Sequence, residues 1–388
     1  MPTDARDLDI VLLGATGFTG ELIARYLAAH APATVRVGLA GRNPAKLEAV
    51  RARTGSAHEL VTVDATDSAA LRDLTARSRV LITTVGPYIV HGDPVVAACA
   101  DTGTDYLDLT GEPEFMDLTY LLHHARAQTT GARLIHACGF DSVPHDLGAQ
   151  FTVGHLPEGV ALSVRGLVRM RGTFSGGTAA SALEIMGRAR QGRATHDIRR
   201  RVEPEPEGRV VRIVTRRVGR DPDTGWWTVP MPTIDPLVVT ESARLLPRYG
   251  PEFSYSHNWA GGNPMAVAGF LGGVGAVAAA AQVPPLRRAL TRLRPSGSGP
   301  NEAQRDAAWF AVRFVGEGDG SRVTTEVSGG DPGYGETSKM IAEAALSLAL
   351  DDLPPTAGQV TTAAALGPAL RTRLEAAGIT FRVLDPAR

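Results

Sequence analysis

The sequence predicts an α/β protein in which a doubly wound parallel sheet is followed by a second, α+β domain with a mixed or antiparallel sheet. Between residues 9 and 140, short β-branched runs alternate with amphipathic helical stretches, which is typical of a parallel sheet covered by helices on both faces. Beyond residue 144 the runs are longer and alternate in polarity, as antiparallel strands do. The 388 residues also exceed what one hydrophobic core usually supports.

Each part of this prediction corresponds to definite segments. Six strands, as in a full doubly wound domain, are expected at residues 10–13, 35–40, 59–63, 80–85, 106–109 and 133–136. Further strands are expected at 161–170, 209–217, 308–315 and 322–327, a helix at 334–350, and strand, helix and strand within 358–384. Residues 194–262 are rich in Arg, Pro and Glu without clear periodicity, and fit either a loop over the substrate or a linker.

Composition excludes several classes of protein. Lys plus Arg (40) and Asp plus Glu (41) nearly cancel, and the short cluster Arg199, Arg200, Arg201 is interpreted as a solvated helix end or loop, so no nucleic-acid partner is expected. Two cysteines are too few for a disulfide framework or a metal-ligand motif. The acidic, polar N-terminus does not resemble a signal peptide, and a cytoplasmic location is expected.

A glycine-rich turn after the first expected strand indicates a nucleotide site. Its glycines are spaced G-x-x-G-x-x-G and lead into a helical stretch, so the backbone could approach a pyrophosphate at the N-terminus of that helix. The alternative is a tight turn that only packs helix on strand. In the first interpretation residues 1–150 form a Rossmann domain, with cofactor contacts from Gly14, Thr16, Gly17, Phe18, Thr19 and Gly20.

The end of the second expected strand favours NADP over NAD. A carboxylate there would bind the ribose hydroxyls of NAD and repel a 2′-phosphate, but this position holds Arg42, whose guanidinium can pair with that phosphate. The alternative is a surface arginine at a helix start. Asp64, after the third strand, is expected to meet the adenine amino group, because Asp67 is the better N-cap for the next helix.

Three further strings, at residues 81–99, 103–112 and 137–144, together with the glycine turn, closely resemble the saccharopine dehydrogenase-like oxidoreductases. The resemblance is greatest to the trans-acting enoyl reductases that work with polyketide synthases in mycobacterial lipid assembly. It implies NADP binding and reduction of a C=C or C=N bond. Residues 151–333 would then be the substrate or oligomerisation domain, and 334–388 a segment that packs on the second domain or returns to the first.

The nicotinamide is expected where the fourth and sixth strands end, because ligands of doubly wound sheets lie at the carboxyl ends of strands. Tyr88 is the first candidate proton donor, with packing as its alternative, and Asp141 is the second. Ser142 could bind substrate or cap the next helix, and Cys138 is interpreted as a packed small residue. The cofactor contacts expected here are Thr84, Val85, Gly86, Pro87, Cys138 and Ser142, and His91 and His145 are candidate proton shuttles.

These observations predict an NADPH-dependent reductase of an enoyl C=C bond in lipid, polyketide or other secondary metabolism, acting on a small-molecule, acyl or polyketide substrate. The alternatives are a saccharopine dehydrogenase-like C=N reductase and a non-catalytic NADP-binding protein. The glycine-rich residues 172–178 are a candidate anion site for the substrate. The sequence leaves open whether the chain forms a homodimer.

The stretch 265–283 contains no charged residue and is followed by Arg287, Arg288, Arg292 and Arg294. Its Ala and Gly content disfavours a transmembrane helix. It fits a close-packed helix buried in the second domain, or a segment that lines an acyl site or rests weakly on a membrane surface, with the arginines facing anionic headgroups.

Overall fold

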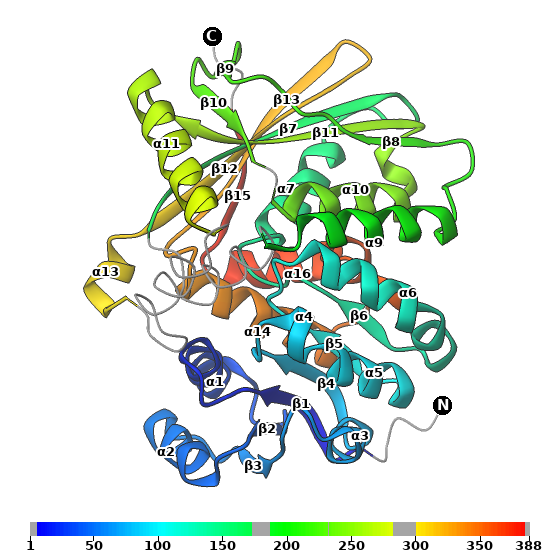
Figure 1. Ribbon diagram of the computed structural model, residues 1–388, viewed down its shortest axis with the longest axis vertical. Coiled ribbons are helices and arrows are strands. Elements are labelled where there is room, and N and C mark those ends of the chain that lie inside the picture. Colours follow the sequence, from blue (N-terminus) through cyan, green and yellow to red (C-terminus); the bar gives the residue numbers. More distant parts are fainter. Residues whose placement is uncertain (1–5, 173–186, 232, 282–299, 385–388) are drawn as a thin grey trace.

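The computed structural model describes residues 6–172, 187–231, 233–281 and 300–384. Two sheets lie one above the other in Figure 1, with helices on and between them. The predicted fold class, a parallel sheet followed by a second α+β domain with a mixed sheet, is confirmed.

The first sheet has seven strands, all parallel, in the order β14-β6-β5-β4-β1-β2-β3. The six strands expected from the sequence are present, with ends shifted by one or two residues. The central strand β1 is buried along its whole length, as its unbroken apolar sequence requires. The strands are β1 (Leu8–Leu13), β2 (Val37–Gly41), β3 (Glu59–Thr62), β4 (Ser78–Thr83), β5 (Asp105–Leu107), β6 (Arg133–Ile135) and β14 (Gly358–Val360).

Helices cover both faces of this sheet (Figure 1). The late helix α14 (Gly335–Leu350) packs against α1 and strands β1, β4 and β5, so residues distant in sequence complete the layer over the first strands. Nearly all of α14 is buried, which explains its run of Ala, Leu and Ile. The other helices of this part are α1 (Phe18–His30), α2 (Pro44–Thr54), α3 (Ser68–Ala76), α4 (Tyr88–His91), α5 (Asp93–Thr102) and α6 (Pro113–Thr130).

The second sheet has eight strands in the order β15-β13-β12-β7-β11-β10-β9, with β8 also paired to β11. It is mixed, because β11 runs parallel to β7 and β8 while the remaining pairs are antiparallel. The strands are β7 (Leu162–Arg171), β8 (Val210–Ile213), β9 (Gly219–Arg220), β10 (Trp227–Pro230), β11 (Glu252–Gly261), β12 (Trp309–Gly318), β13 (Ser321–Gly329) and β15 (Thr380–Leu384). The C-terminal segment thus contributes β14 to the first sheet and β15 to the second.

Residues 194–262 are not a loop or linker, and this expectation is wrong. They contain most of α9 (Ala189–Val202), the whole of α10 (Asp235–Leu245), a 3-10 turn (Pro247–Tyr249) and four strands, including β11 near the centre of the sheet. The expected strand at 209–217 ends at Ile213. The sequence shows no clear periodicity here because the strands β8, β9 and β10 are only two to four residues long.

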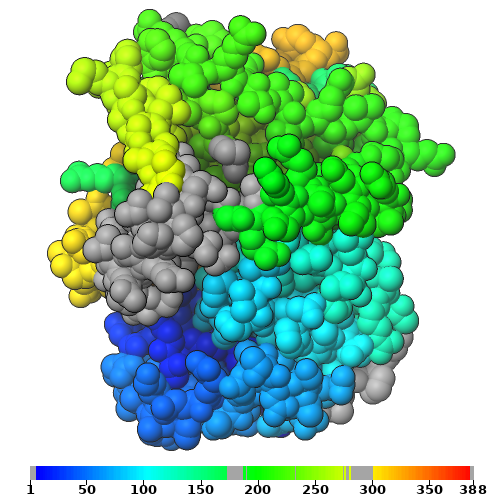
Figure 2. Space-filling view, viewed as in Figure 1, coloured from blue at the N-terminus to red at the C-terminus, as the bar shows by residue number. Residues whose placement is uncertain are grey.

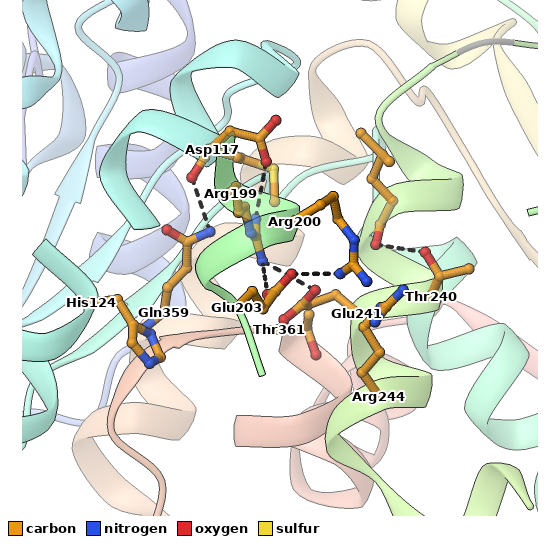
Figure 3. A network of polar contacts seen from close by, with 12 residues as sticks. Asp117, His124, Arg199, Arg200, Glu203, Thr240, Glu241, Arg244, Gln359 and Thr361 are labelled. Atoms are coloured by element: carbon orange, nitrogen blue, oxygen red, sulfur yellow. Dashed lines mark hydrogen bonds and ion pairs between the residues drawn. The ribbon is translucent and has the colours of Figure 1, made fainter. Parts of the chain in front are cut away.

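The arginine cluster lies in the last turn of α9, as predicted for a helix end, and Arg201 is exposed, but Arg199 is not solvated. Arg199 of α9 is 5% exposed and faces α6 and α10, where it pairs with three carboxylates (Figure 3). A buried guanidinium needs such partners, because an unpaired charge would be costly to desolvate. The N–O distances from Arg199 are 3.3 Å to Asp117, 2.7 Å to Glu203 and 3.1 Å to Glu241.

Helix α11 (Pro264–Ala281) corresponds to the uncharged stretch. The interpretation as a buried helix is wrong for its described side chains, most of which are exposed. Among the helices of the described ranges, none is long and apolar enough to cross a membrane. The four arginines that follow this stretch in sequence lie outside the described residues.

Helix α7 (Val143–Gly154) connects the two sheets. It starts eight residues after β6 of the first sheet ends, and packs on β7, β12 and β13 of the second. Contact is so close that a Cβ on Gly148 would lie 2.3 Å from the Phe314 ring. In its first turn the buried Asp146 carboxylate accepts hydrogen bonds from Ser242 Oγ of α10 (2.5 Å), Thr362 Oγ1 (2.7 Å) and the Ala363 amide (2.8 Å). The last two belong to α15 (Thr362–Ala365), which precedes α16 (Gly367–Ala376).

We predict that Asp146→Ala lowers the free energy of unfolding by about 2–4 kcal/mol, because three buried donors lose their acceptor. Chemical denaturation followed by circular dichroism measures the change. Asp73→Ala, at an exposed position of α3, is the matched control and should change stability by less than about 0.5 kcal/mol. A loss for Asp146→Ala as small as that of the control would contradict the role assigned to this carboxylate.

Candidate active site

The turn from β1 to α1 has the shape of a pyrophosphate cradle. Gly14 has a φ of +89°, and a Cβ there would lie 2.6 Å from Thr84 Oγ1. A Cβ on Gly20 would lie 2.2 Å from the Gly14 carbonyl oxygen, so only glycine lets α1 approach β1 this closely. Gly17 is the N-cap of α1, with no side-chain capping bond, and is exposed. The first-turn N–H groups of α1 therefore remain available to an anion.

The cradle lies where strand order changes direction. β1 pairs with β2 on one side and β4 on the other, which is the switch point at which doubly wound sheets bind their ligands. Thr16 and Thr19 are half-buried around the turn. The Phe18 ring meets the ring of Tyr334, from the start of α14, edge-on with centroids 4.8 Å apart. An aromatic pair thus joins the cradle to the C-terminal part of the chain.

At the outer end of the cradle, Arg42 directly follows β2 and is exposed. Asp67 is the N-cap of α3 and accepts from the amides of Ala69 and Ala70, which confirms its predicted capping role. Asp64 accepts from the amide and hydroxyl of Thr66 (2.9 and 2.8 Å). These bonds, and then the charge of Arg42, lower the pKa of Asp64. Arg42 and Asp64 therefore lie near enough for their charges to interact, just beyond the carboxyl ends of β2 and β3.

At the end of β4, Thr84 Oγ1 donates to the Gly14 carbonyl (3.2 Å), and Val85 and Gly86 follow it at the sheet edge. Pro87 is the N-cap of α4. The Glu112 carboxylate, from the loop after β5, accepts the amides of Tyr88 (3.1 Å) and Ile89 (2.8 Å). This residue, which sequence reasoning missed, fixes the loop that faces the cradle.

Tyr88, the first candidate proton donor, is bonded to the backbone. Its hydroxyl donates to the Thr83 carbonyl and accepts from the Leu109 amide, both at 3.2 Å, so its hydrogen-bonding capacity is used by the backbone. The residue is 6% exposed, and burial raises its pKa well above the usual range. Its ring lies near that of Phe115, with centroids 5.9 Å apart. Tyr88 is therefore in the position of the packing residue that was its alternative.

The end of β6 brings the other predicted residues together. Cys138 is fully buried, with Sγ 3.4 Å from the Ile135 carbonyl, and burial raises the pKa of its thiol. Ser142 is the N-cap of α7, but its hydroxyl makes no capping bond, contrary to the expectation that it would cap this helix well. Its Oγ is buried without a protein partner among the described residues. An unpaired buried hydroxyl at this sheet edge fits a site that binds a polar ligand.

Asp141 lies in the same loop and is half-buried, with its Oδ2 3.7 Å from the position of a Cβ on Gly111. The loops after β5 and β6 therefore meet at this carboxylate. Burial, and then the negative charge of Asp235, raises the pKa of Asp141 to about 7, although part of the side chain still reaches solvent. A carboxyl group with this pKa can hold a proton near neutral pH and give it up.

Behind Asp141 lies a buried group of three titratable side chains, His145 of α7, Asp235 of α10 and His257 of β11. His145 Nε2 is 3.0 Å from Asp235 Oδ1, and His257 Nε2 is 3.6 Å from Asp235 Oδ2. The two imidazoles lower the pKa of Asp235 against the effect of burial, and burial lowers the pKa of His257 to about 4. Their ligand atoms lie within 4.8 Å of one another and could hold a metal ion. Among the described residues, His145 Nδ1 and Asp235 Oδ1 have no hydrogen-bond partner in the protein.

Sequence reasoning proposed His145 as a proton shuttle but missed Asp235 and His257. Both lie in the stretch without periodicity, and they are 90 and 112 residues from His145 along the chain. No local motif links them, so only the tertiary structure reveals the group. The candidate anion site at 172–178 lies, apart from Gly172, outside the described residues.

A glycine cradle at the switch point of a parallel sheet, with a titratable cluster at the neighbouring strand ends, defines a dinucleotide-binding oxidoreductase. Residues 10–135 match the family model described as the saccharopine dehydrogenase NADP-binding domain. The chain belongs to the saccharopine dehydrogenase-like oxidoreductases, as the sequence motifs predicted, and NADP is its dinucleotide.

Similarity to relatives extends over the full chain. A protein of Mycobacterium tuberculosis, provisionally named a trans-acting enoyl reductase, is 39% identical over 98% of this chain and 99% of its own. A trans-acting enoyl reductase of Mycobacterium bovis is 36% identical over 97% of both chains. The fold is shared with apo saccharopine dehydrogenase (L-Glu forming) of Saccharomyces cerevisiae, at a TM-score of 0.55 and 13% identity over 97% of this chain and 100% of that one.

We predict that Arg42→Ala weakens NADPH binding about ten- to a hundredfold and leaves NADH binding nearly unchanged, because the guanidinium is expected to pair with the 2′-phosphate that only NADPH carries. Fluorescence titration with both cofactors measures the two affinities. Arg25→Ala, on the exposed side of α1, is the control for loss of a positive charge. Equal affinities of the unaltered protein for NADPH and NADH would contradict this assignment.

Proposed function

We propose that this protein is an NADPH-dependent reductase that reduces the C=C bond of an enoyl substrate in lipid or polyketide metabolism. The relatives named trans-acting enoyl reductases support the reaction class. The observation that most supports it in the structure is the position of Asp141. This carboxyl group lies at the same sheet edge as the cradle and in front of the buried cluster of His145, Asp235 and His257.

The chain's own residues account for binding and orientation. Gly14, Gly17 and the first turn of α1 would hold the pyrophosphate, and Arg42 the 2′-phosphate. The loops at 84–87 and 138–142 would border the nicotinamide. When bound, NADPH supplies the hydride, as it does in reductases generally. The protein must then deliver a proton to the neighbouring carbon of the substrate.

Asp141 is the proton donor in this proposal. Its pKa of about 7 means that a large fraction is protonated near neutral pH, whereas the Tyr88 hydroxyl is already bonded to the backbone. The proton leaves the carboxyl oxygen and bonds to the substrate carbon, and Asp141 remains as a carboxylate until solvent reprotonates it. Partial exposure of Asp141 provides that route.

Asp235 is a positioning residue in this scheme. It is buried and ionised, and its negative charge disfavours a second carboxylate nearby, so it keeps the proton on Asp141. The imidazoles of His145 and His257 hold Asp235 in place. These contacts of Asp235 are buried, so the electrostatic interactions within them are stronger than they would be in water.

We predict that Asp141→Asn lowers kcat by about two orders of magnitude or more and leaves the NADPH affinity nearly unchanged, because an amide cannot donate the proton. Stopped-flow measurement of NADPH oxidation with an enoyl thioester tests this. Tyr88→Phe is the comparison variant and should retain most of its turnover. If Tyr88→Phe lost as much activity as Asp141→Asn, the assignment of the donor would be wrong.

The pH profile provides a second test of the same assignment. Since only protonated Asp141 can donate, turnover should fall as the pH rises through its pKa of about 7. Asp235→Asn removes a charge that raises this pKa, so the falling limb should move to lower pH. NADPH affinity shows whether this variant is folded. A limb that does not move in a folded Asp235→Asn protein would contradict the positioning role.

A further inference from the structure

Helix α11 is an apolar helix on the outside of the molecule. None of its 18 residues is charged, and it directly follows β11 and contacts β10 and β11 of the second sheet. In Figure 1 it projects at the upper left, and the same yellow-green segment forms an outer surface in Figure 2. Apolar helices of this length in water-soluble proteins are normally buried, so its exposure needs an explanation.

Only a narrow strip of α11 is anchored to the protein. Among its described side chains, Val267 is the buried one and Phe270 beside it is half-buried. The Phe270 ring stacks on Trp259 of β11, with centroids 4.6 Å apart and planes 5° from parallel. The large side chains outside this strip are exposed, Met265 by 83% and Leu271 by 44%.

The exposed positions extend around most of the helix. At about 100° per residue, the exposed residues from Leu271 round to Ala266 span roughly 220° of the circumference, and the half-buried Ala280 of the last turn is the one exception among the described side chains of this arc. The glycines at 269, 272, 273 and 275 lie within this arc, and a Cβ on any of them would meet nothing within 4 Å. An apolar surface this wide is more than one protein partner usually covers, because a helix packs on a neighbour through a narrower stripe.

We propose that α11 inserts into the surface of an anionic lipid bilayer. Lipid surrounds an inserted helix on every side that the protein leaves free, so it matches the wide apolar arc. α11 is not long and apolar enough to cross a membrane, which limits it to the interfacial region.

Charge complementarity favours an anionic surface. Small side chains dominate the exposed arc, so apolar transfer alone gives weak binding. The sequence that follows, residues 282–299, contains four arginines and neither Asp nor Glu. Positive charge close in sequence to an interfacial helix strengthens its binding to anionic headgroups, and salt screens this electrostatic contribution. The proposal is independent of the reaction, since α11 takes no part in the scheme for Asp141.

Co-sedimentation of the full chain with extruded vesicles tests the proposal. Phosphatidylcholine vesicles containing phosphatidylglycerol are compared with vesicles of phosphatidylcholine alone, at low and high salt. We expect binding to the anionic vesicles at low salt. The double variant Met265→Asp, Leu271→Asp should reduce it at least about tenfold, because charged residues are costly in the interface. Leu122→Asp, at a 62% exposed position of α6, is the matched control and should bind as the unaltered protein does.

Four results would overturn the proposal. The first is that the unaltered protein stays in solution with anionic vesicles at low salt. The second is that the double variant binds these vesicles as well as the control does. Equal binding to both kinds of vesicle would contradict the anionic surface. The fourth result would come from sedimentation velocity. If the unaltered protein were a dimer and the double variant a monomer, α11 would contact a second copy of the chain instead of lipid. NADPH affinity confirms that each variant is folded, so a failed reductase assay would not affect the outcome.

Discussion

The first turn of α7 is the constraint on which the rest of the structure depends. It follows the loop after β6 of the parallel sheet, and its buried Asp146 carboxylate accepts hydrogen bonds from α10 and α15. The same turn contains His145, and Asp141 and Ser142 directly precede it. The contact that joins the two sheets and the residues of the candidate site therefore belong to one short segment. Movement of one sheet against the other would displace both.

Buried charge is the second feature of this region. Two imidazoles lower the pKa of Asp235 against the effect of burial, whereas the pKa of Asp141 is raised by burial and by the negative charge of Asp235, which outweigh the opposing effect of His145. Burial alone disfavours the charged form of both carboxyls, so the difference between them comes from their neighbours. Two acids with different proton affinities in one site are a recurrent arrangement in proton-transfer enzymes. Here one acid is proposed to donate and the other to keep it protonated.

The sequence predicted the elements that depend on local pattern. Strands β1 to β6 followed from β-branched runs, the cradle from the spacing of Gly14, Gly17 and Gly20, and the capping role of Asp67 from its position before α3. What the sequence could not reveal depended on distant partners. The hydroxyl of Tyr88 is used by backbone groups of β4 and the loop after β5, which no spacing reveals.

The sequence also did not reveal which charged side chains are buried. Arg199 could be interpreted as a surface residue until Asp117, Glu203 and Glu241 were placed around it by α6, α9 and α10 (Figure 3). The central strand β11 was missed because a region of short strands and charged helices surrounds it in sequence. Family resemblance supplied the cofactor and reaction class, and the proposal of Asp141 rather than Tyr88 as the donor depends on tertiary contacts.

Transfer of deuterium tests the central claim most directly. The protein is incubated with an enoyl thioester and NADPH that carries deuterium at the transferable position of the nicotinamide, and the product is analysed by mass spectrometry. The account predicts a saturated product with one deuterium from the cofactor and one hydrogen from solvent at the adjacent carbon. A product without deuterium, or cofactor oxidation only with an imine-forming amine and ketone, would contradict it.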